Sequence, residues 1–344
     1  MSSALESKLE MALANLPRVR LGVDNTPLEH LPRFSAALGG PQVWIKRDDL
    51  TGLAFGGNKT RMLEYSMAAA VERGADTVVF GAAVQSNYCR QLAGACAKLG
   101  MTLHLVLRSE REIDRTAITG NNLVQRLLGA HVTVLSDNDR DRQQEMIAAK
   151  AEALRAAGHN VFVPRQDDTV DLDVIAYAES ALELVRQCRQ EEIDPRYVYV
   201  CAADTTQTGL VLGLKAVGSP MQVKGINPAF KKDNEERMAW TANQAADRLD
   251  LDVTLTAADF DNDDSFVGER YGIPSPEGMA ALRLLAQTEG ILTDPVYSSK
   301  ALAGLVAHIR SGALPPHEPV VFLHTGGAPA IFGYTEEMVA ALEE

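Results

Sequence analysis

A lysine that follows a glycine-bearing loop is the residue of this chain whose type and position best fit covalent chemistry. The stretch IKRDDLTGLAFGGNKTRMLEY (45–65) has the pattern of a short strand, an acidic pair, a loop, and then Lys59 at the start of an amphipathic helix. The helix dipole disfavours an ammonium group there and lowers its pKa. Such a lysine can form a Schiff base with an aldehyde cofactor, or act as a base near neutral pH. On the evidence of this stretch alone, an exposed lysine at the start of a surface helix is an alternative interpretation of Lys59.

The same loop is similar to a nucleotide-binding loop but lacks the required spacing. A Walker A loop has the form GxxxxGK[ST]; Gly52 to Gly57 satisfy GxxxxG, but Asn58 intervenes before Lys59 and Thr60. This shift displaces the lysine relative to the loop amides, and no aspartate-ended strand suited to magnesium is evident. We therefore do not expect a nucleotide hydrolase.

Composition and charge exclude several classes of protein. The 344 residues include 33 basic and 46 acidic side chains, for a net charge of −13, and 46% of them are hydrophobic. This length predicts about two domains with cores of their own. An acidic chain lacks the basic face that nucleic acids require. No apolar run approaches the roughly 20 residues that span a bilayer, and no signal peptide is evident. We expect a cytoplasmic globular protein without nucleic-acid or membrane partners.

The cysteines and the acidic segments show no metal-binding or disulfide pattern. The cysteines are Cys89, Cys96, Cys188 and Cys201. No two of these cysteines form a CxxC motif, and four cysteines are too few for a secreted disulfide scaffold of this length. Segments 136–144 and 259–265 are expected to be acidic surface loops, and their spacing does not match an EF-hand. We predict reduced thiols and no metal site.

Short β-branched runs alternate with segments of helical period, which is typical of an α/β protein with a mainly parallel sheet. We expect strands at 42–47, 77–83, 102–108, 131–135, 160–164, 197–203, 222–227 and 320–325. We expect helices to begin near Asn58, Ser86, Asn121, Arg140, Leu172, Gln207, Asp233, Glu277, Ser298 and Glu336. No Pro/Ser-rich linker marks a domain boundary.

Several collinear motifs resemble the D-cysteine desulfhydrase and 1-aminocyclopropane-1-carboxylate deaminase family of pyridoxal 5′-phosphate (PLP) enzymes. Besides 45–65, they are TPLEHLPRFS (26–35), VQSNYCRQLAGACAKLG (84–100), YAESALEL (177–184), GIPSPEGMAALRLLAQTEGILTDPVYSSKALAGL (272–305) and FLHTGGAPAIFGY (322–334). The resemblance implies the tryptophan synthase β-like fold (fold type II): two α/β domains with open, twisted, mainly parallel sheets and PLP in the cleft between them. The smaller domain, 55–160, would be inserted into the larger one, 1–54 plus 161–344. The resemblance also implies a homodimer.

The family motifs also imply roles for the lysine and for the start of the next helix. Lys59 would hold the PLP aldehyde, and Ser86 and Asn87 would face the cofactor and the substrate carboxylate, with Asn87 hydrogen-bonded to the cofactor ring oxygen. Free amides at a helix start do bind anions. An ordinary N-cap pair is the alternative for Ser86 and Asn87.

The PLP phosphate is expected where strand 197–203 meets the following helix. Thr205, Thr206, Thr208 and Gly209 would bind it through hydroxyls and helix-terminal amides. Relatives carry a run rich in glycine and serine here, so the chain departs from the family. Asp204 would repel a phosphate dianion unless it points away or pairs with a base.

Two tyrosines and two hydroxyl residues match the remaining part of the family site. Tyr297 and Tyr271 are candidate acids, bases or leaving-group partners; structural tyrosines bonded to backbone are the alternative. Ser298 and Thr325 match positions beside the pyridine ring. Ser298 stands where the deaminase branch has a glutamate. A hydroxyl in place of this glutamate favours β-elimination over the opening of a cyclopropane ring.

The expected reaction is an α,β-elimination from a small β-substituted amino acid. Lys59 would remove the Cα proton, the β-substituent would leave, and the remainder would hydrolyse to pyruvate and ammonia. D-cysteine, releasing hydrogen sulfide, is the first candidate. The 1-aminocyclopropane-1-carboxylate deaminase reaction and a non-catalytic PLP-binding protein of cofactor homeostasis are alternatives.

Two further departures from the family leave the substrate open. Tyr88 replaces the family's histidine, and Arg165 lies in PRQDDTVDLD (164–173) where relatives have glycine and serine. Arg165 could bind a second anion, as in L-cysteate, or pair with Asp167 or Asp168. Alternatively, Asp167, Asp168 and Asp204 could accept a cationic end of the substrate.

Overall fold

Ten strands form two sheets in the computed structural model, which describes residues 4–201 and 204–343. The larger sheet has the order β1-β2-β10-β7-β8-β9, and all its neighbours are parallel except β1 and β2. Its strands are β1 (Leu28–His30), β2 (Val43–Lys46), β10 (Val320–Leu323), β7 (Tyr197–Cys201), β8 (Gln222–Ile226) and β9 (Asp261–Asp263). The smaller sheet, β5-β4-β3-β6, is entirely parallel. Its strands are β3 (Thr77–Phe80), β4 (Thr102–Leu107), β5 (His131–Val134) and β6 (Val161–Phe162).

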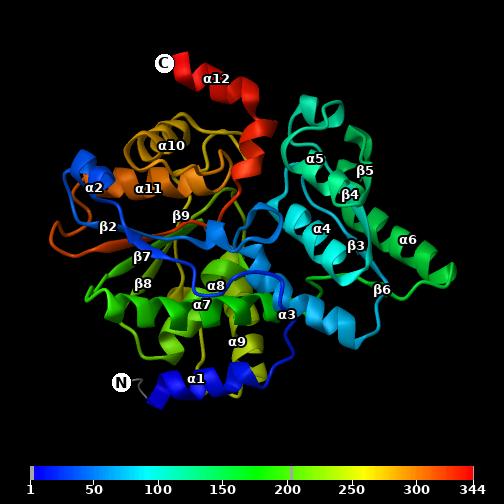
Figure 1. The fold of residues 1–344 in the computed structure, drawn as a ribbon, viewed down its shortest axis with the longest axis horizontal. Helices are drawn as coiled ribbons and strands as arrows, with labels where there is room; N and C mark the ends of the chain where they lie inside the picture. The colour runs from blue at the N-terminus through cyan, green and yellow to red at the C-terminus, as the bar shows by residue number, and fades with distance from the viewer. Residues whose placement is uncertain (1–3, 202–203, 344) are drawn as a thin grey trace.

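Helices cover both faces of the larger sheet (Figure 1). One face carries α2 (Pro32–Leu38), α10 (Pro276–Glu289) and α11 (Ser298–Arg310). The other carries α7 (Val170–Gln190), α8 (Thr205–Ala216) and α9 (Asn234–Arg248), with α1 (Ala4–Ala14) packed outside them. Because the central strands are buried on both faces, they are continuous apolar runs such as the VVFL of β10.

The smaller sheet is also covered on both faces. α4 (Asn87–Leu99) and α5 (Gly120–Leu127) lie on one side, and α6 (Gln143–Ala156) packs its Ile147 and Ala151 against the other. The C-terminal helix α12 (Thr335–Glu343) lies near α10 (Figure 1).

Helix α3 (Lys59–Glu72) joins the two sheets. Its Met62 and Tyr65 lie in the core against the larger sheet, whereas Leu63 and Met67 lie in the core of the smaller one. The N-terminus of α3, where Lys59 stands, is therefore positioned by both halves of the molecule.

The predicted elements are largely confirmed. All eight expected strands form, with shorter bounds, and the expected helices begin close to the predicted positions; residues 202–203 of the expected strand 197–203 lie outside the described residues. The expectation that 259–265 is only a loop was wrong, because Asp261–Asp263 form the edge strand β9 beside β8. An edge strand tolerates acidic side chains on its open side, and Lys224 of β8 donates to Asp261 at 2.6 Å. β1, α1 and α2 lie outside the predicted set.

Candidate active site

The loop before Lys59 has a fixed, compact conformation. Gly56 has φ +69°, and a Cβ there would lie 1.9 Å from the carbonyl oxygen of Asp49, so only glycine fits. The buried Arg90 guanidinium donates to the carbonyl oxygens of Ala54 and Gly56. Because its carbonyls are held this way, the loop delivers Lys59 to a defined position.

The loop amides are used internally and do not form a phosphate cradle. The amide of Gly57 donates to Thr51 Oγ1 at 2.8 Å, and that of Asn58 donates to the carbonyl of Thr325 at 3.1 Å. The amide of Gly56 donates to the carbonyl of Leu53. These bonds are the structural reason why the loop cannot bind a nucleotide phosphate as a Walker A loop does.

Lys59 begins α3 in an environment that favours its neutral form. Burial lowers the pKa of Lys59, and the positive charge of Arg165 lowers it further, whereas the carboxylates of Asp204 and Asp294 oppose the shift. The Lys59 Nζ lies 5.9 Å from the centroid of the Tyr297 ring. A neutral amine beside a phenol can serve as a nucleophile or a base.

Tyr297 and Tyr271 form a hydrogen-bonded pair beside this lysine. Their hydroxyl groups contact each other, and their rings meet edge-on with centroids 5.8 Å apart. Burial raises the pKa of Tyr271 to about 12 and raises the pKa of Tyr297 well above its usual value. Both phenols therefore stay protonated at neutral pH, which suits proton donation rather than base catalysis.

Ser86 and Asn87 lie at the start of α4, as expected. Ser86 is its N-cap, and its Oγ accepts from the amide of Cys89 at 3.2 Å. The Asn87 side chain accepts from Asn121 Nδ2 at 2.8 Å and donates to Asp294 Oδ2 at 3.3 Å. Ser86 is thus an N-cap, and Asn87 is oriented by partners on two other segments.

Asp294 is a buried residue of this site that the sequence reasoning missed. Its Oδ1 accepts from the amides of Val296 and Tyr297, at 2.8 and 2.6 Å. Its Oδ2 accepts from Asn87 Nδ2 and from Ser298 Oγ, both at 3.3 Å. Burial raises the pKa of Asp294. The sequence signal that could have identified Asp294 is its position before Pro-Val-Tyr, where an aspartate side chain can accept hydrogen bonds from the amides that follow it.

Ser298 and Thr325 also come together, at the N-terminus of α11 and after β10. Their hydroxyl oxygens are 3.3 Å apart, and Ser298 Oγ donates to the carbonyl oxygen of Gly326 at 3.0 Å. Both side chains are buried. The structure therefore places this hydroxyl pair next to Asp294.

The four residues expected at the phosphate lie in the first turns of α8. Thr206 Oγ1 accepts from Asn58 Nδ2 at 2.8 Å, which joins the starts of α8 and α3. Thr205 Oγ1 lies 3.8 Å from the sulfur of Met62, and Thr208 Oγ1 donates to the carbonyl of Asp204 at 3.2 Å. Gly209 has a packing role, since a Cβ there would lie 2.2 Å from the carbonyl oxygen of Val174 on α7.

Arg165 pairs with two aspartates, but not with those adjacent to it in sequence. Its Nε lies 3.1 Å from Asp173 Oδ2, and its Nη2 bonds to Asp204 Oδ1. The interpretation that Asp167 or Asp168 pairs with Arg165 was wrong, because Asp168 pairs with Arg73 on the surface. Asp204 therefore has a basic partner, which was one of the two conditions under which it would not repel a phosphate.

Tyr88, the residue that replaces the family's histidine, lies against Arg165. It is buried, and the Arg165 guanidinium carbon lies 5.3 Å from its ring centroid. A cation above an aromatic face is attracted by the ring quadrupole. Tyr88 therefore helps to fix the side chain of Arg165.

These residues fit the expected cofactor. An amine, a carboxamide and a hydroxyl pair lie in one region. The start of α8 offers helix-terminal amides and buried threonine hydroxyls to a phosphate, and Arg165 lies beside it, paired with the N-cap residue Asp204. Within residues 4–201 and 204–343, no cluster of three or more His, Cys, Asp or Glu side chains is arranged to bind a metal ion. None of the helices that these residues form is both long and apolar enough to cross a bilayer.

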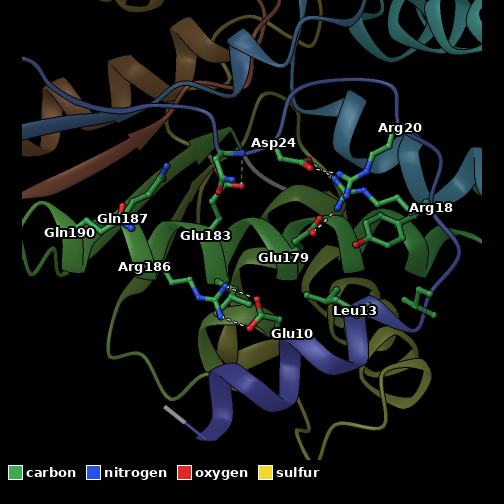
Figure 2. A pocket seen from close by; sticks show the side chains of 15 residues that line it. Glu10, Leu13, Arg18, Arg20, Asp24, Glu179, Glu183, Arg186, Gln187 and Gln190 are labelled. Carbon is green, nitrogen blue, oxygen red and sulfur yellow. Dashed lines mark hydrogen bonds and ion pairs between the residues drawn. The ribbon is translucent and has the colours of Figure 1, made fainter. Parts of the chain in front are cut away.

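A pocket of about 600 Å³ lies elsewhere, between α1 and α7 (Figure 2). None of the predicted site residues lines it. Its charged side chains pair with one another, as in Arg186 with Glu10 at 2.8 Å and Arg18 with Glu179 at 2.7 Å. No lysine is among the described residues that line it, so this pocket lacks the amine that Lys59 supplies.

Comparison with known proteins shows the family of the chain. Residues 19–326 match the family described as "Pyridoxal-phosphate dependent enzyme". A D-cysteine desulfhydrase of Salmonella typhi is 38% identical over 327 residues, which cover 94% of this chain and 97% of that protein. The crystal structure of an ACC deaminase homologue is 31% identical, with a TM-score of 0.86 over 97% of this chain and 99% of that chain. Threonine deaminase isoform 2 from Solanum lycopersicum, 17% identical, has a TM-score of 0.66 over 100% of this chain and 90% of its own, and shares the fold.

Proposed function

The chain belongs to the pyridoxal-phosphate dependent enzyme family, and from this premise we propose that it is a carbon-sulfur lyase that eliminates the β-substituent of a small amino acid. D-cysteine, converted to pyruvate, ammonia and hydrogen sulfide, is the proposed substrate. Its support is the 38% identity to D-cysteine desulfhydrases across nearly their whole length. The two mainly parallel sheets have the expected tryptophan synthase β-like arrangement.

One observation carries the chemical part of the proposal: a lysine whose pKa is lowered lies against a pair of phenols whose pKa values are raised. Bound PLP supplies an electron sink for the charge left on Cα. The chain must then supply a base for the Cα proton and an acid for the leaving group. Lys59 fits the first role because it is neutral more readily than an exposed lysine, and Tyr297 fits the second because it stays protonated.

The other residues hold the reactants in place. Asn87, fixed by Asn121 and Asp294, would orient the cofactor ring, and Ser298 would face the pyridine nitrogen. Ser86 and the amides at the start of α4 would receive the substrate carboxylate. Tyr271 would return a proton to Tyr297 through their shared hydrogen bond.

The choice between reactions rests on Ser298 and Arg165. A neutral hydroxyl at 298 supports β-elimination, although the likeness to an ACC deaminase homologue keeps ring-opening deamination as the second candidate. L-cysteate has less support, because Asp173 and Asp204 already neutralise Arg165, the cation that a sulfonate would need.

Purified protein tests the proposal directly. We expect a visible absorption band from the cofactor's Schiff base, together with pyruvate and sulfide from D-cysteine. Lys59→Ala should abolish both, whereas Lys150→Ala, at an exposed lysine of α6, should leave both intact. A colourless protein that does not take up PLP would disprove the proposal.

The products from other substrates separate the alternatives. Sulfite from L-cysteate would indicate the sulfonate branch, and 2-oxobutyrate from 1-aminocyclopropane-1-carboxylate would indicate the deaminase branch. A coloured protein that releases none of these products would instead support the non-catalytic role in cofactor homeostasis.

We also propose the domain division 55–160 and 1–54 plus 161–344, a homodimer, and a cytoplasmic location. Strands β3 to β6 all lie within 77–162, which supports the inserted domain. Four free thiols, three of them buried, are compatible with a reducing compartment. Analytical ultracentrifugation tests the homodimer, and cell fractionation tests the cytoplasmic location.

A further inference from the structure

An aspartate occupies the anion-binding end of α8. Asp204 is the N-cap, and its Oδ1 accepts from the amide of Thr205 at 2.9 Å. The same oxygen bonds to Arg165 Nη2. A helix-terminal amide and a guanidinium are the donors that a phosphate group takes at such a position. The carboxylate thus uses two donors of the kind that bind a phosphate.

Arg165 is held independently of Asp204. Its Nε lies 3.1 Å from Asp173, a fully buried residue of α7, and its guanidinium lies over the Tyr88 ring. Its backbone is in the left-handed region, with φ +60°. These contacts keep the guanidinium in place when one of its partners changes.

Asp204, in contrast, is open to solvent. Its side chain is 51% exposed, against 21% for Arg165 and none for Asp173. Lys231 adds a second positive charge that acts on Asp204. Moving a half-exposed carboxylate into water costs little, whereas moving a buried one would leave an unpaired charge.

We propose that Asp204 is an internal competitor of the cofactor's phosphate, and that Arg165 is the cation for which the two compete. The inference rests on PLP as the cofactor, but not on which amino acid is the substrate. When phosphate binds, Asp204 gives up the Thr205 amide and Arg165 and turns toward solvent. The competition weakens PLP binding and makes its affinity depend on this one ion pair.

The two halves of the pair then have opposite effects on affinity. Asp204→Asn keeps an N-cap acceptor, removes the competing charge and frees Arg165, so PLP should bind more tightly. Arg165→Gln removes the shared cation, so PLP should bind more weakly. A merely structural ion pair would not give effects of opposite sign.

The experiment compares PLP with pyridoxal, which has the same aldehyde and ring but no phosphate. Full-length protein is stripped of cofactor, placed in phosphate-free buffer and titrated with each compound, and binding is followed by the circular dichroism of the bound chromophore. We expect Asp204→Asn to lower the Kd for PLP by about three- to tenfold and Arg165→Gln to raise it about tenfold or more. The Kd for pyridoxal should change much less in either variant, because the substituted charges act on it only through the pKa of Lys59.

Matched controls come from the exposed pair of Arg73 and Asp168, 3.0 Å apart. Arg73→Gln and Asp168→Asn should leave both dissociation constants unchanged. Thermal unfolding checks that each variant is folded. If Arg165→Gln is not folded, Asp204→Asn and Asp204→Ser still show whether removing the carboxylate lowers or raises the Kd for PLP.

Unchanged or weaker PLP binding in Asp204→Asn would overturn the proposal. An equal change for pyridoxal would also overturn it, because the effect would then not involve the phosphate. If wild-type protein bound neither compound, the cofactor assignment itself would be wrong, which is a separate result. No amino acid is present, so the identity of the substrate does not affect the outcome.

Discussion

At the scale of single residues, burial gives the site both an acid and a base. Removing water disfavours the charged form of any side chain, so it lowers the pKa of Lys59 and raises that of Tyr297. The amine therefore becomes available as a base at the pH at which the phenol remains an acid. One physical cause thus supplies the complementary groups that an elimination requires.

Replacing the phenols tests the proton donor. We expect Tyr297→Phe to lower kcat about 100-fold with little change in KM, because it removes the proposed proton donor but keeps the ring that lies 5.9 Å from Lys59 Nζ. Tyr271→Phe should have a smaller effect, since it acts through Tyr297. Steady-state kinetics with D-cysteine measures both, and a larger effect at Tyr271 would reverse the proposed order of proton transfer.

Asp173 should make stability depend on pH. Burial raises its pKa to about 7 from the usual 3.8. Between these values the folded state binds more protons than the unfolded state, so the contribution of Asp173 to stability falls as pH rises. Asp173→Asn should reduce the loss of stability between about pH 4 and pH 7. Urea unfolding at several pH values measures the difference in slope between the two proteins, and equal slopes would contradict the shift.

At the scale of elements, close helix packing at α8 determines where its N-terminus lies. A Cβ at Gly209 would lie 2.2 Å from the carbonyl oxygen of Val174, and one at Gly213 would lie 2.6 Å from that of Ala178. These glycines let α7 and α8 approach with little space between their backbones. The approach brings Asp173 and Asp204 to the same guanidinium.

Gly209→Ala should therefore push α8 away from α7. We expect a loss of about 1–3 kcal/mol in the free energy of unfolding and weaker PLP binding. Gly94→Ala in α4 is the matched control, because its nearest neighbours are side-chain atoms at 3.0–3.2 Å and alanine favours a helix. Urea unfolding compares the two, and an equal loss would show that the Gly209 contact is not decisive.

At the scale of the whole molecule, a buried cluster of charges ties α3 to the larger sheet. Arg61 donates to Asp48 at 3.0 Å and to Glu183 of α7 at 2.8 Å, and Tyr177 donates to Asp48 at 2.7 Å. Lys46 of β2 also bonds to Glu183. Arg61 lies two residues after Lys59, so this cluster fixes the helix that carries the lysine.

Arg61→Met should be strongly destabilising. It leaves the buried carboxylates without their main partner, which costs about 3–5 kcal/mol. Arg73→Met, on the same segment but in an exposed pair with Asp168, should cost less than about 1 kcal/mol. Denaturant unfolding measures both; similar values would show that the buried cluster does not hold α3.

Much of this protein was determined by its sequence alone. The alternation of apolar strand runs with helical segments predicted eight strands and a mainly parallel sheet, because burial on both faces leaves a local pattern. The division into two sheets was expected only from the family resemblance. Lys59 was identifiable because a glycine-bearing loop before a helix is also a local feature. Ser86, Asn87, Tyr297 and Ser298 were proposed from motifs, and they lie at the starts of α4 and α11.

The partners of these residues were decided only by the tertiary structure. Arg165 pairs with Asp173 and Asp204 rather than with its neighbours in sequence, because α7 and α8 bring those aspartates to it. Asp294 belongs to the site because it accepts a hydrogen bond from Asn87, which is 207 residues away along the chain. Sequence specifies local conformation and residue chemistry, whereas ion pairing and burial depend on which distant segments meet, and here that meeting sets the charge at the N-terminus of α8.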